Sequence, residues 1–427
     1  MSYPRDVFVV DGARTPQIKS KNKPGPFSAS DLAVAAGRAV LARQPFHPSE
    51  LGEVVVGCVM PSVEEVNIGR VVSLRLGCGK KVPAFTVARN CASGLQALDS
   101  AAKDISIGRH EMALAGGTES MSRFPLLWDA KMQSWFTDFA TAKTFGKKLS
   151  AVASFHLKYL KPVIGVMEGL TDHVAGVNMG QTAENLAHRF NISRTEMDAF
   201  SAESHKRLAF AADNGRLEEL VPIFGTDGTV YDADDGLRRD STVEKLGKLK
   251  PAFERKFGKV TAGNSAQITD GSAMLLLASG VAVKKHGLPV LGRLVDVQWS
   301  GVEPTEMGLG PVHAIAELLK RNNMKTVDYW EINEAFATQV LACLKAYADP
   351  GYLKNEVGIE TPLEPIDTAR LNIDGGGVSM GHPVGASGAR ITLHLLNVLK
   401  RNKARFGVAS MCIGGGQGGA VLLERVS

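Results

Sequence analysis

The sequence has no run of 18 uninterrupted apolar residues, no HExxH motif and no cysteine pair at CxxC spacing. The first absence excludes a helix that spans a membrane. The other two leave no zinc pattern, and the ten histidines are scattered, so we expect no metal. Five cysteines are few for 427 residues and odd in number, which argues against a disulfide framework and favours a reducing compartment. Because no signal or transit pattern opens the sequence, we expect a cytoplasmic protein.

The chain also lacks a strong charge of either sign, since 49 Lys and Arg against 44 Asp and Glu give a net charge of +5. No concentrated basic stripe is present, so we expect no nucleic-acid partner. Hydrophobic residues make up 44% and charged residues 22%, which excludes a disordered, collagen-like or coiled-coil chain. The length predicts roughly two to three domains. The 45 glycines cluster in short runs, which indicates specialised turns.

Short β-branched segments alternate with longer helical patterns, which predicts an α/β fold. The helix expected over 31–42 has Ser28 three residues before Asp31, which is the spacing of a capping box. The predicted strands cover residues 7–10, 54–56, 113–117, 274–278 and 408–411.

One order of elements occurs twice. Residues 92–94 (ASG) open a helical pattern, which a charged turn and a strand ending at Gly116 follow. Residues 386–388 (ASG) open a second such helix, which a basic turn and a strand ending near Cys412 follow. The intervals are alike, at 22 residues from 94 to 116 and 24 from 388 to 412. The repetition favours a duplicated α/β unit, although many unrelated α/β proteins also have ASG before a helix.

The segment 124–175 has no clear strand pattern, and its aromatic residues from Trp128 to Phe139 lie at helical spacing. It contains six lysines, no arginine and four acidic residues. We therefore expect an inserted, slightly basic pair of amphipathic helices. One interpretation is a lid packed on the protein's own core or on a sister subunit. The other is a surface over 124–165 that docks on a membrane or a partner.

Cys91 directly precedes the first repeated helix, within residues 89–94 (RNCASG). A helix N-terminus offers free N–H groups and a positive dipole end, which favour the thiolate over the thiol. The same N–H groups can hold a developing oxyanion. The alternative is a buried cysteine that serves as a small apolar residue.

Three further residues could carry chemistry. His382 lies in the glycine-rich segment 375–388, just before the second repeated helix, where it could act as a general base for a thiol. Cys412 ends a strand before a glycine-rich turn, and an ordinary thiol pKa of about 8.5 suits proton transfer. The alternatives are a structural loop histidine and a small buried cysteine. Asn333, in EINEAFA, is either a site residue or a helix cap.

Eight segments resemble the thiolase family, almost from end to end and in family order. They are GARTP at 12–16, NCASG at 90–94, ALAGGTESMS at 113–122, MGQTAEN at 179–185, TAGNS at 261–265, NEAFA at 333–337, GHPVGASGAR at 381–390 and CIGGGQG at 412–418. The resemblance implies two similar α/β halves with an inserted loop domain. The N-terminal half would be residues 1–123 with 254–285, the loop domain 124–253 and the C-terminal half 286–427.

The resemblance also implies a two-step acyl transfer to coenzyme A. Cys91 would attack the 3-keto carbon of a 3-ketoacyl-CoA, with His382 as its activating base. Cys412 would protonate the acetyl-CoA enolate and then activate the incoming CoA. Asn333 and His382 would form a first oxyanion hole, and the amides of Cys91 and Gly414 a second. CoA and acyl-CoA would be substrates, with no permanently bound cofactor.

Three positions match family residues that contact CoA or the acyl chain. Arg238 matches an arginine beside the adenine, on which a guanidinium can stack. Phe336 resembles an acyl-pocket residue, and Ser265 could replace the hydrogen bond of a family serine for which this chain has Ala266. The alternatives are a solvated surface arginine and a core aromatic residue.

Departures from the family pattern bear on the substrate. Asn178 stands where short-chain tetrameric members often carry a histidine. The segment at 124–165 and Thr269 resemble the thiolase subunits of fatty-acid β-oxidation complexes, whereas Asn333 argues the other way. These features predict a 3-ketoacyl-CoA thiolase of lipid metabolism that accepts medium or long chains.

Other functions and the expected partners follow from the same resemblance. The alternatives are an acetoacetyl-CoA-forming biosynthetic thiolase, a condensing ketoacyl synthase and a non-catalytic docking subunit. The second cysteine, Cys412, favours a thiolase over a synthase. The resemblance implies a homo-oligomer, and it raises a hydratase/dehydrogenase partner subunit and peripheral membrane contact through 124–165 as further hypotheses.

Overall fold

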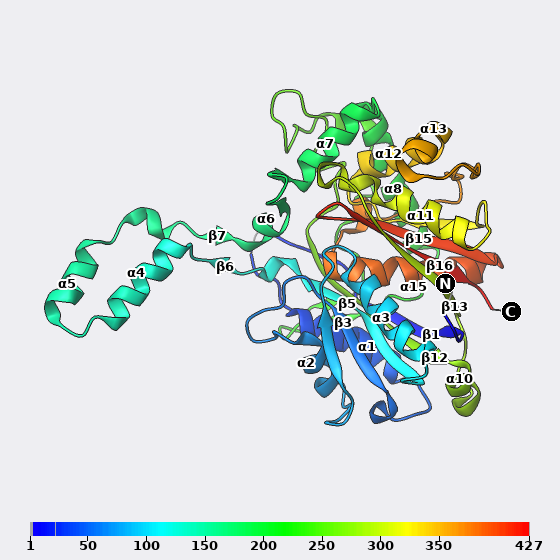
Figure 1. The fold of residues 1–427 in the computed structure, drawn as a ribbon, viewed down its shortest axis with the longest axis horizontal. Helices are drawn as coiled ribbons and strands as arrows, with labels where there is room; N and C mark the ends of the chain where they lie inside the picture. Colours follow the sequence, from blue (N-terminus) through cyan, green and yellow to red (C-terminus); the bar gives the residue numbers. More distant parts are fainter. Residues whose placement is uncertain (1–2, 22, 427) are drawn as a thin grey trace.

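A ten-stranded sheet forms the centre of the computed structural model, which describes residues 3–21 and 23–426 (Figure 1). The strand order is β14-β15-β16-β13-β1-β12-β5-β3-β4, and the short β2 pairs with β12. These strands are β1 (Val7–Arg14), β2 (Ile18–Lys19), β3 (Glu53–Gly57), β4 (Ala84–Val87), β5 (Met112–Ser120), β12 (Thr269–Ser279), β13 (Gly292–Gly301), β14 (Tyr329–Ile332), β15 (Phe406–Ile413) and β16 (Gln417–Glu424). Shorter strands form three separate pairs: β6 (Leu126–Leu127) with β7 (Val163–Ile164), β8 (Thr171–Asp172) with β9 (Val177–Asn178), and β10 (Ile223–Phe224) with β11 (Val230–Tyr231).

The large sheet consists of two copies of one strand arrangement. Read outward from the middle, one copy is β1-β12-β5-β3 and the other is β13-β16-β15-β14. In each copy the first two pairings are antiparallel and the third is parallel. Strands β1 and β13 join the copies by a short antiparallel pairing. The repetition confirms the duplicated α/β unit predicted from the sequence.

Helices lie between the two copies and on their outer faces. They are α1 (Ala29–Leu41), α2 (Ile68–Arg75), α3 (Ser93–Ser106), α4 (Ala130–Thr141), α5 (Phe145–Ala153), α6 (Gly165–Gly169), α7 (Met179–Arg189), α8 (Arg194–Asp213), α9 (Val243–Gly247), α10 (Gly280–His286), α11 (Gly310–Arg321), α12 (Ala337–Tyr347), α13 (Pro350–Tyr352), α14 (Gly377–Met380) and α15 (Val384–Asn402). The predicted capping box of α1 is present, because Ser28 and Asp31 exchange side-chain and backbone hydrogen bonds. All five predicted strands are found, and each extends further than predicted.

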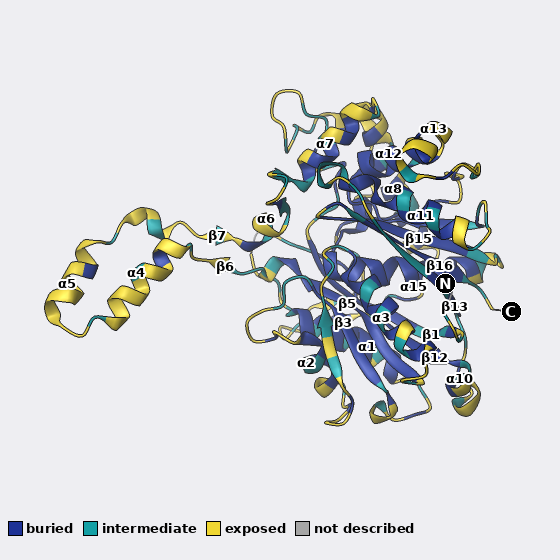
Figure 2. Ribbon diagram, in the orientation of Figure 1, coloured by how far each residue is buried: buried dark blue, intermediate teal, exposed yellow. Residues whose placement is uncertain are grey.

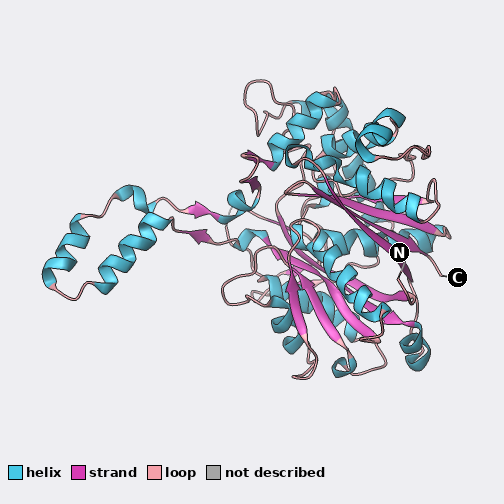
Figure 3. Ribbon diagram, viewed as in Figure 1, coloured by secondary structure: helices cyan, strands magenta, loops and turns pink. Residues whose placement is uncertain are grey.

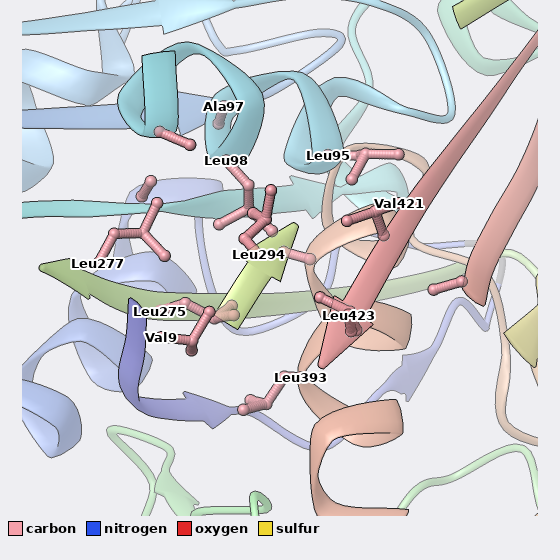
Figure 4. Close-up of a cluster of buried hydrophobic side chains, with 14 of the residues drawn as sticks. Val9, Leu95, Ala97, Leu98, Leu275, Leu277, Leu294, Leu393, Val421 and Leu423 are labelled. Carbon is pink, nitrogen blue, oxygen red and sulfur yellow. The ribbon is translucent and has the colours of Figure 1, made fainter. Parts of the chain in front are cut away.

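Alternate strand residues face different layers, because successive side chains point to opposite sides of a sheet. In β12, Leu275 faces a central cluster with α3 and α15, whereas Leu276 faces an outer cluster with α1 and α2. In β16, Leu423 joins the central cluster and Leu422 an outer cluster with α11 and α12. Figure 4 shows the central cluster, to which both halves contribute. The helices α3 and α15 are thus buried between the two copies.

Glycines let α3 and α15 approach closely. A Cβ atom on Gly388 would lie 2.7 Å from the backbone nitrogen of Leu95, and one on Gly94 would lie 2.8 Å from the carbonyl oxygen of Gly385. Real Cβ atoms avoid such distances, so larger residues would push the helices apart. The close crossing brings the N-termini of the two repeated helices together. Cys91 lies just before one of these N-termini and His382 just before the other.

Residues 126–164, termed the arm, project from the body as two helices on a pair of short strands (Figures 1 and 3). Strands β6 and β7 form its base, and α4 packs against α5 and against the 3-10 turn Leu157–Leu160. The predicted amphipathic helices are therefore present. The expectation of no strand in this region is wrong for β6, β7 and β8, and a lid on the protein's own core is also wrong, because the arm extends outward (Figure 2).

Among the described residues, no helix is both long enough and apolar enough to cross a membrane.

Candidate active site

Cys91 lies in the short connection from β4 to α3. Asn90 has a φ of 42°, a conformation that asparagine tolerates better than most residues. The Ser93 hydroxyl donates to the Asn90 carbonyl over 2.7 Å and accepts the Arg89 amide over 2.9 Å. The Asn90 side-chain amide donates to the Gly414 carbonyl of the other half over 2.8 Å. These bonds fix Cys91 against the turn between β15 and β16.

A cavity of about 260 Å³ opens beside Cys91. Its wall includes the backbone of Gly414 and Gly415 and the start of α15 at Val384. The remaining lining residues are mostly apolar and come from the loops after β3, β4 and β5, from residues 169–174 after the arm and from α7: Val59, Asn90, Met121, Phe124, Gly169, Leu170, Thr171, Asp172, His173, Val174 and Met179. Cys91 is half-buried and faces this space, so its sulfur can meet a ligand.

Burial raises the pKa of the Cys91 thiol, while hydrogen bonds from the amides of Gly414 and of Cys91 itself oppose the rise. The N–H groups favour the thiolate, as expected from the position of Cys91 before α3, but burial has the larger effect on the thiol pKa. The two amides nevertheless point at the sulfur, which is the arrangement that stabilises negative charge on an attached oxygen. A thiol held protonated at rest requires a base.

His382 can supply that base. Its Nδ1 lies 2.6 Å from the Ser387 hydroxyl, and this hydroxyl donates its single proton to the Pro383 carbonyl over 3.0 Å. Nδ1 therefore carries the ring proton, and Nε2 keeps its lone pair. Burial, helped by the charge of Arg390, lowers the pKa of His382 to about 4, so the ring is neutral near pH 7. Ser387 stands inside the GHPVGASGAR segment, but its spacing from His382 gave no signal of this contact.

Asn333 and His382, which the family resemblance assigns to one oxyanion hole, lie side by side. The Asn333 side-chain nitrogen lies 3.4 Å from His382 Nε2, and its oxygen Oδ1 is buried with no hydrogen-bond partner. Asn333 follows the end of β14, and its backbone amide donates to the Ser410 carbonyl over 2.9 Å. It is not the cap of α12, which begins four residues later at Ala337. The geometry leaves its side chain free to position a polar ligand beside His382.

Cys412 lies near the end of β15 and is buried. Burial raises the pKa of its thiol far above the ordinary value, and the neighbouring Cys91 raises it further. The assumption of an ordinary thiol pKa is therefore wrong, and Cys412 rests as a proton donor. Cys412 also packs in a small apolar cluster with Phe336 and with Met179, which lines the cavity.

Glu119 joins the two halves beneath the site and had no sequence signal beyond its place in ALAGGTESMS. Its carboxylate accepts hydrogen bonds from the amides of Val59, Met60 and Gly385, over 2.9, 3.1 and 3.0 Å. Burial raises its pKa to about 7 in spite of these bonds. Glu119 thus links a cavity-lining loop to the first turn of α15.

Arg238, Ser265 and Phe336, the residues expected to contact CoA or the acyl chain, are not among the residues that line the cavity beside Cys91. The Ser265 hydroxyl donates to the Thr261 carbonyl over 2.7 Å, and the Ser265 backbone bridges to Phe336. Phe336 is nearly buried and meets Phe253 edge to face, with ring centroids 5.9 Å apart. Arg238 is exposed and does not line the cavity beside Cys91. Its loop touches the loop that precedes His382, because a Cβ on Gly236 would lie 2.7 Å from the Met380 carbonyl oxygen.

The duplicated fold, with two cysteines and a histidine where the halves meet, defines the class as a two-half α/β acyltransferase. Models of the thiolase N-terminal and C-terminal domains match residues 7–280 and 288–425. The chain belongs to the thiolase family.

Full-length relatives agree with this assignment. The chain is 36% identical to the mitochondrial 3-ketoacyl-CoA thiolase of Bos taurus, over 100% of both chains. It is 37% identical to a beta-ketoadipyl-CoA thiolase of Pseudomonas knackmussii, over 99% of this chain and 100% of the relative. The crystal structure of human mitochondrial 3-ketoacyl-CoA thiolase in complex with CoA superposes with a TM-score of 0.85 at 34% identity, covering 100% of this chain and 99% of the other. An acetyl-CoA acetyltransferase from Syntrophomonas wolfei gives a TM-score of 0.86 at 33% identity, covering 99% of this chain and 100% of the other.

Proposed function

We propose that this protein cleaves 3-ketoacyl-CoA with CoA to give acetyl-CoA and a shortened acyl-CoA. The observation that supports it most is the position of Cys91, which faces an apolar cavity while two backbone amides point at its sulfur. A covalent acyl-cysteine fits this space, with the chain in the cavity and the carbonyl oxygen near the amides.

In the first half-reaction His382 Nε2 takes the Cys91 proton, and the thiolate attacks the 3-keto carbon. The bond between C2 and C3 breaks, and its electron pair moves to C2 as the enolate of acetyl-CoA. Cys412 donates a proton to C2, which its raised pKa favours, since a thiol must rest protonated to act as the acid. Asn333 and the newly protonated His382 stabilise the enolate oxygen.

In the second half-reaction the Cys412 thiolate takes the proton of the incoming CoA thiol. The CoA sulfur attacks the acyl-cysteine, whose oxyanion the amides of Cys91 and Gly414 stabilise. The bond to Cys91 then breaks, and His382 returns the proton to its sulfur. The same steps in reverse would form acetoacetyl-CoA from two acetyl-CoA molecules, so the residues serve both directions.

The test is CoA-dependent loss of 3-ketoacyl-CoA for wild type, Cys91→Ser and Cys78→Ala. Cys78 is a buried cysteine in the outer cluster of the N-terminal half and serves as the matched control. We expect Cys91→Ser to lose on the order of 10⁴-fold or more in rate and Cys78→Ala to stay close to wild type. Unchanged cleavage by Cys91→Ser would refute the mechanism, and no cleavage by wild type at any chain length would favour the condensing or scaffold alternatives.

We propose an unbranched fatty acyl chain of medium or long length rather than a chain with a terminal carboxylate. Seven of the cavity-lining side chains are apolar: Val59, Met121, Phe124, Leu170, Val174, Met179 and Val384. The one histidine in the lining, His173, faces Glu168 over 3.2 Å, and Asp172 would repel a carboxylate. We therefore expect kcat/KM to rise from four-carbon to longer 3-ketoacyl-CoA substrates and 3-ketoadipyl-CoA to be poor. The reverse order would contradict this choice.

Arg238 and Ser265 are proposed to contact CoA, and Phe336 the acyl pocket. The support for Arg238 is the contact of its loop with the His382 loop and its exposure, which leaves the guanidinium free to stack on a base. Arg238→Ala should raise the KM for CoA with little change in kcat, whereas Arg239→Ala next to it should not, because Arg239 pairs with Asp213. Equal effects of the two variants would refute the assignment.

We infer that the arm docks on an anionic lipid surface. Its apolar side chains are unusually exposed for a helical pair, with Phe145 at 83% and Leu157 at 80%. Six lysines and two aspartates lie between 126 and 164, which gives the arm a net positive charge. Both this charge and the exposed apolar side chains favour binding to an anionic lipid surface. Wild type should sediment with anionic vesicles at low salt, and Phe145→Ser should weaken this more than Ser134→Thr. Binding only to a hydratase/dehydrogenase protein would assign the arm to a partner subunit instead.

We further propose a homo-oligomer in a reducing compartment such as the cytoplasm. Strand β4 is at the edge of the large sheet and exposes Phe85, which a second copy could cover. All five cysteines are free, which fits a reducing compartment. Each subunit is proposed to consist of an N-terminal half (1–123 with 254–285), a loop domain (124–253) and a C-terminal half (286–427). A monomer mass in light scattering would refute the oligomer.

A further inference from the structure

Three side chains that the acyl-transfer mechanism does not use gather at the opposite end of β3 from the active site. Glu53 is the first residue of β3, whose last residue leads into the loop with Val59. Asp104 lies in the last turn of α3, and His110 lies in the turn before β5. A carboxylate oxygen from each acid and a ring nitrogen of the histidine all lie within 4.8 Å of one another. Three separate elements therefore converge there (Figure 1).

Glu53 is the unusual member of this group. Only 4% of the residue is exposed, and its Oε1 has no hydrogen-bond partner. A buried carboxyl group without a partner is costly, and such groups are normally paired or bound to a metal. The free Oε1 of Glu53 is therefore available to a ligand.

The backbone holds His110 toward this carboxyl group. A Cβ atom on Gly52 would lie 2.5 Å from the His110 ring, so only glycine fits beside it. The Gly52 amide donates to the Met112 carbonyl over 2.9 Å, which fixes the start of β3 against the start of β5. No hydrogen bond of the described residues uses the His110 ring, and Asp104 has one oxygen on Arg109 and the other free.

We propose that Glu53, Asp104 and His110 bind a divalent transition-metal ion of the zinc or cobalt type. One imidazole nitrogen and two carboxylate oxygens suit such ions, whereas Mg²⁺ and Ca²⁺ prefer oxygen ligands alone. Ligand atoms around a tetrahedral zinc ion lie about 3.4 Å apart, which small rotamer changes reach from the present spacing. Water completes the coordination, because Asp104 and His110 are only half-buried.

The ion would tie β3, α3 and the turn before β5 together at a distance from the acyl-transfer chemistry. It binds the folded chain and not the unfolded one, so it stabilises the fold by mass action. This inference does not depend on the proposed thiolytic function, since none of the three ligands touches the Cys91 cavity.

The test is titration of the full-length protein with Co²⁺, followed by absorbance and by thermal unfolding at pH 7.5. Wild type should show weak ligand-field bands and a rise in unfolding temperature, and Mg²⁺ at the same concentration should give neither. Glu53→Gln and His110→Ala should weaken Co²⁺ binding on the order of 10- to 100-fold or more. Glu64→Gln, an exposed acid elsewhere, is the matched control and should bind like wild type.

Two further measurements show whether the ion is held by these three side chains. Arg109→Ala removes a competing cation from Asp104 and should tighten Co²⁺ binding. Without metal, Glu53→Gln should be as stable as wild type or more so, because it removes the buried carboxylate. Equal Co²⁺ binding by wild type and Glu53→Gln would overturn the proposal. An intense thiolate-to-cobalt band that disappears in Cys91→Ser would overturn it too, since the ion would then be on the catalytic thiols.

Discussion

Residues 84–120, which carry Cys91, and the arm of residues 126–164 are neighbours in the sequence but differ in how they are held. Every residue of β5 is buried, and α3 lies between both copies of the sheet. In the arm only Met132 and Ala151 are buried (Figure 2). Helical periodicity is present in both, so periodicity alone does not say whether a helix will find a core. The difference teaches that the residues around Cys91 are held by packing between the halves, whereas the apolar side chains of the arm are left exposed.

The largest expected effect is a loss of catalytic activity on substitution of His382. His382→Asn removes the neutral base beside Asn333 and should lower kcat on the order of 10²- to 10⁴-fold. It should also slow iodoacetamide alkylation of Cys91, because that thiol has a raised pKa and loses its proton acceptor. The arm supplies the control, since His156→Asn changes an exposed histidine. Similar activities of the two variants would show that His382 is only structural.

Two glycine-to-alanine substitutions, one in α15 and one in the arm, compare how tightly the two regions are packed. In Gly388→Ala the new methyl group would lie 2.7 Å from the Leu95 backbone, so we expect a loss of about 1–3 kcal/mol in the free energy of unfolding. In Gly146→Ala the methyl group meets nothing within 4 Å, and alanine favours the α5 helix by about 1 kcal/mol. Chemical denaturation should show a lower midpoint for the first variant, and circular dichroism no loss of helix for the second. A destabilised Gly146→Ala variant would mean that the arm packs on something else.

Buried charge gives the body a pH dependence that the arm lacks. His394 lies 3.0 Å from Glu219 and 3.3 Å from Asp374. Burial alone would lower the pKa of His394, but these carboxylates outweigh it and raise the pKa to about 10. The protonated His394 therefore stabilises the folded state fully below about pH 6.5. This contribution to the free energy of unfolding is lost as the pH rises toward 10, by about 1 kcal/mol per pH unit. Unfolding at pH 7, 8 and 9 should show this slope in wild type and His156→Gln. The slope should shrink in His394→Gln, and an unchanged slope there would refute the assignment.

Much of the fold could be predicted because the signals are local. Alternation and β-branching predicted the strands around Val55 and Leu275, and the Ser28 spacing predicted the start of α1. The repeated ASG segments predicted the duplicated halves, since small residues are needed wherever α3 and α15 cross. The motif around Asn333 and His382 led to a contact that the structure shows.

Other features depend on distances that no local pattern contains. The thiol pKa values of Cys91 and Cys412 follow from burial between two halves, which spacing in the sequence does not report. Glu119 acts through amides of both halves, and the contact of Ser387 with His382 needs the turn at Pro383. The sequence also contained no signal for the direction in which the arm points. An amphipathic helix face predicts an apolar contact, but it does not say whether that contact is with the same chain or with another molecule.

The smallest effect on the body should come from removing the arm. Replacing residues 128–160 with a short Gly-Ser turn leaves the β6–β7 base, whose strands pair at Leu126 and Leu127. Because the arm helices pack chiefly on each other, the free energy of unfolding of the body should change by less than about 1 kcal/mol. Cleavage of short 3-ketoacyl-CoA should stay within about twofold of wild type, since that corresponds to only about 0.4 kcal/mol of barrier. Association with anionic vesicles should be lost, while a shift in acyl-chain preference without loss of binding would mean that the arm closes over the Cys91 cavity in the assembled protein.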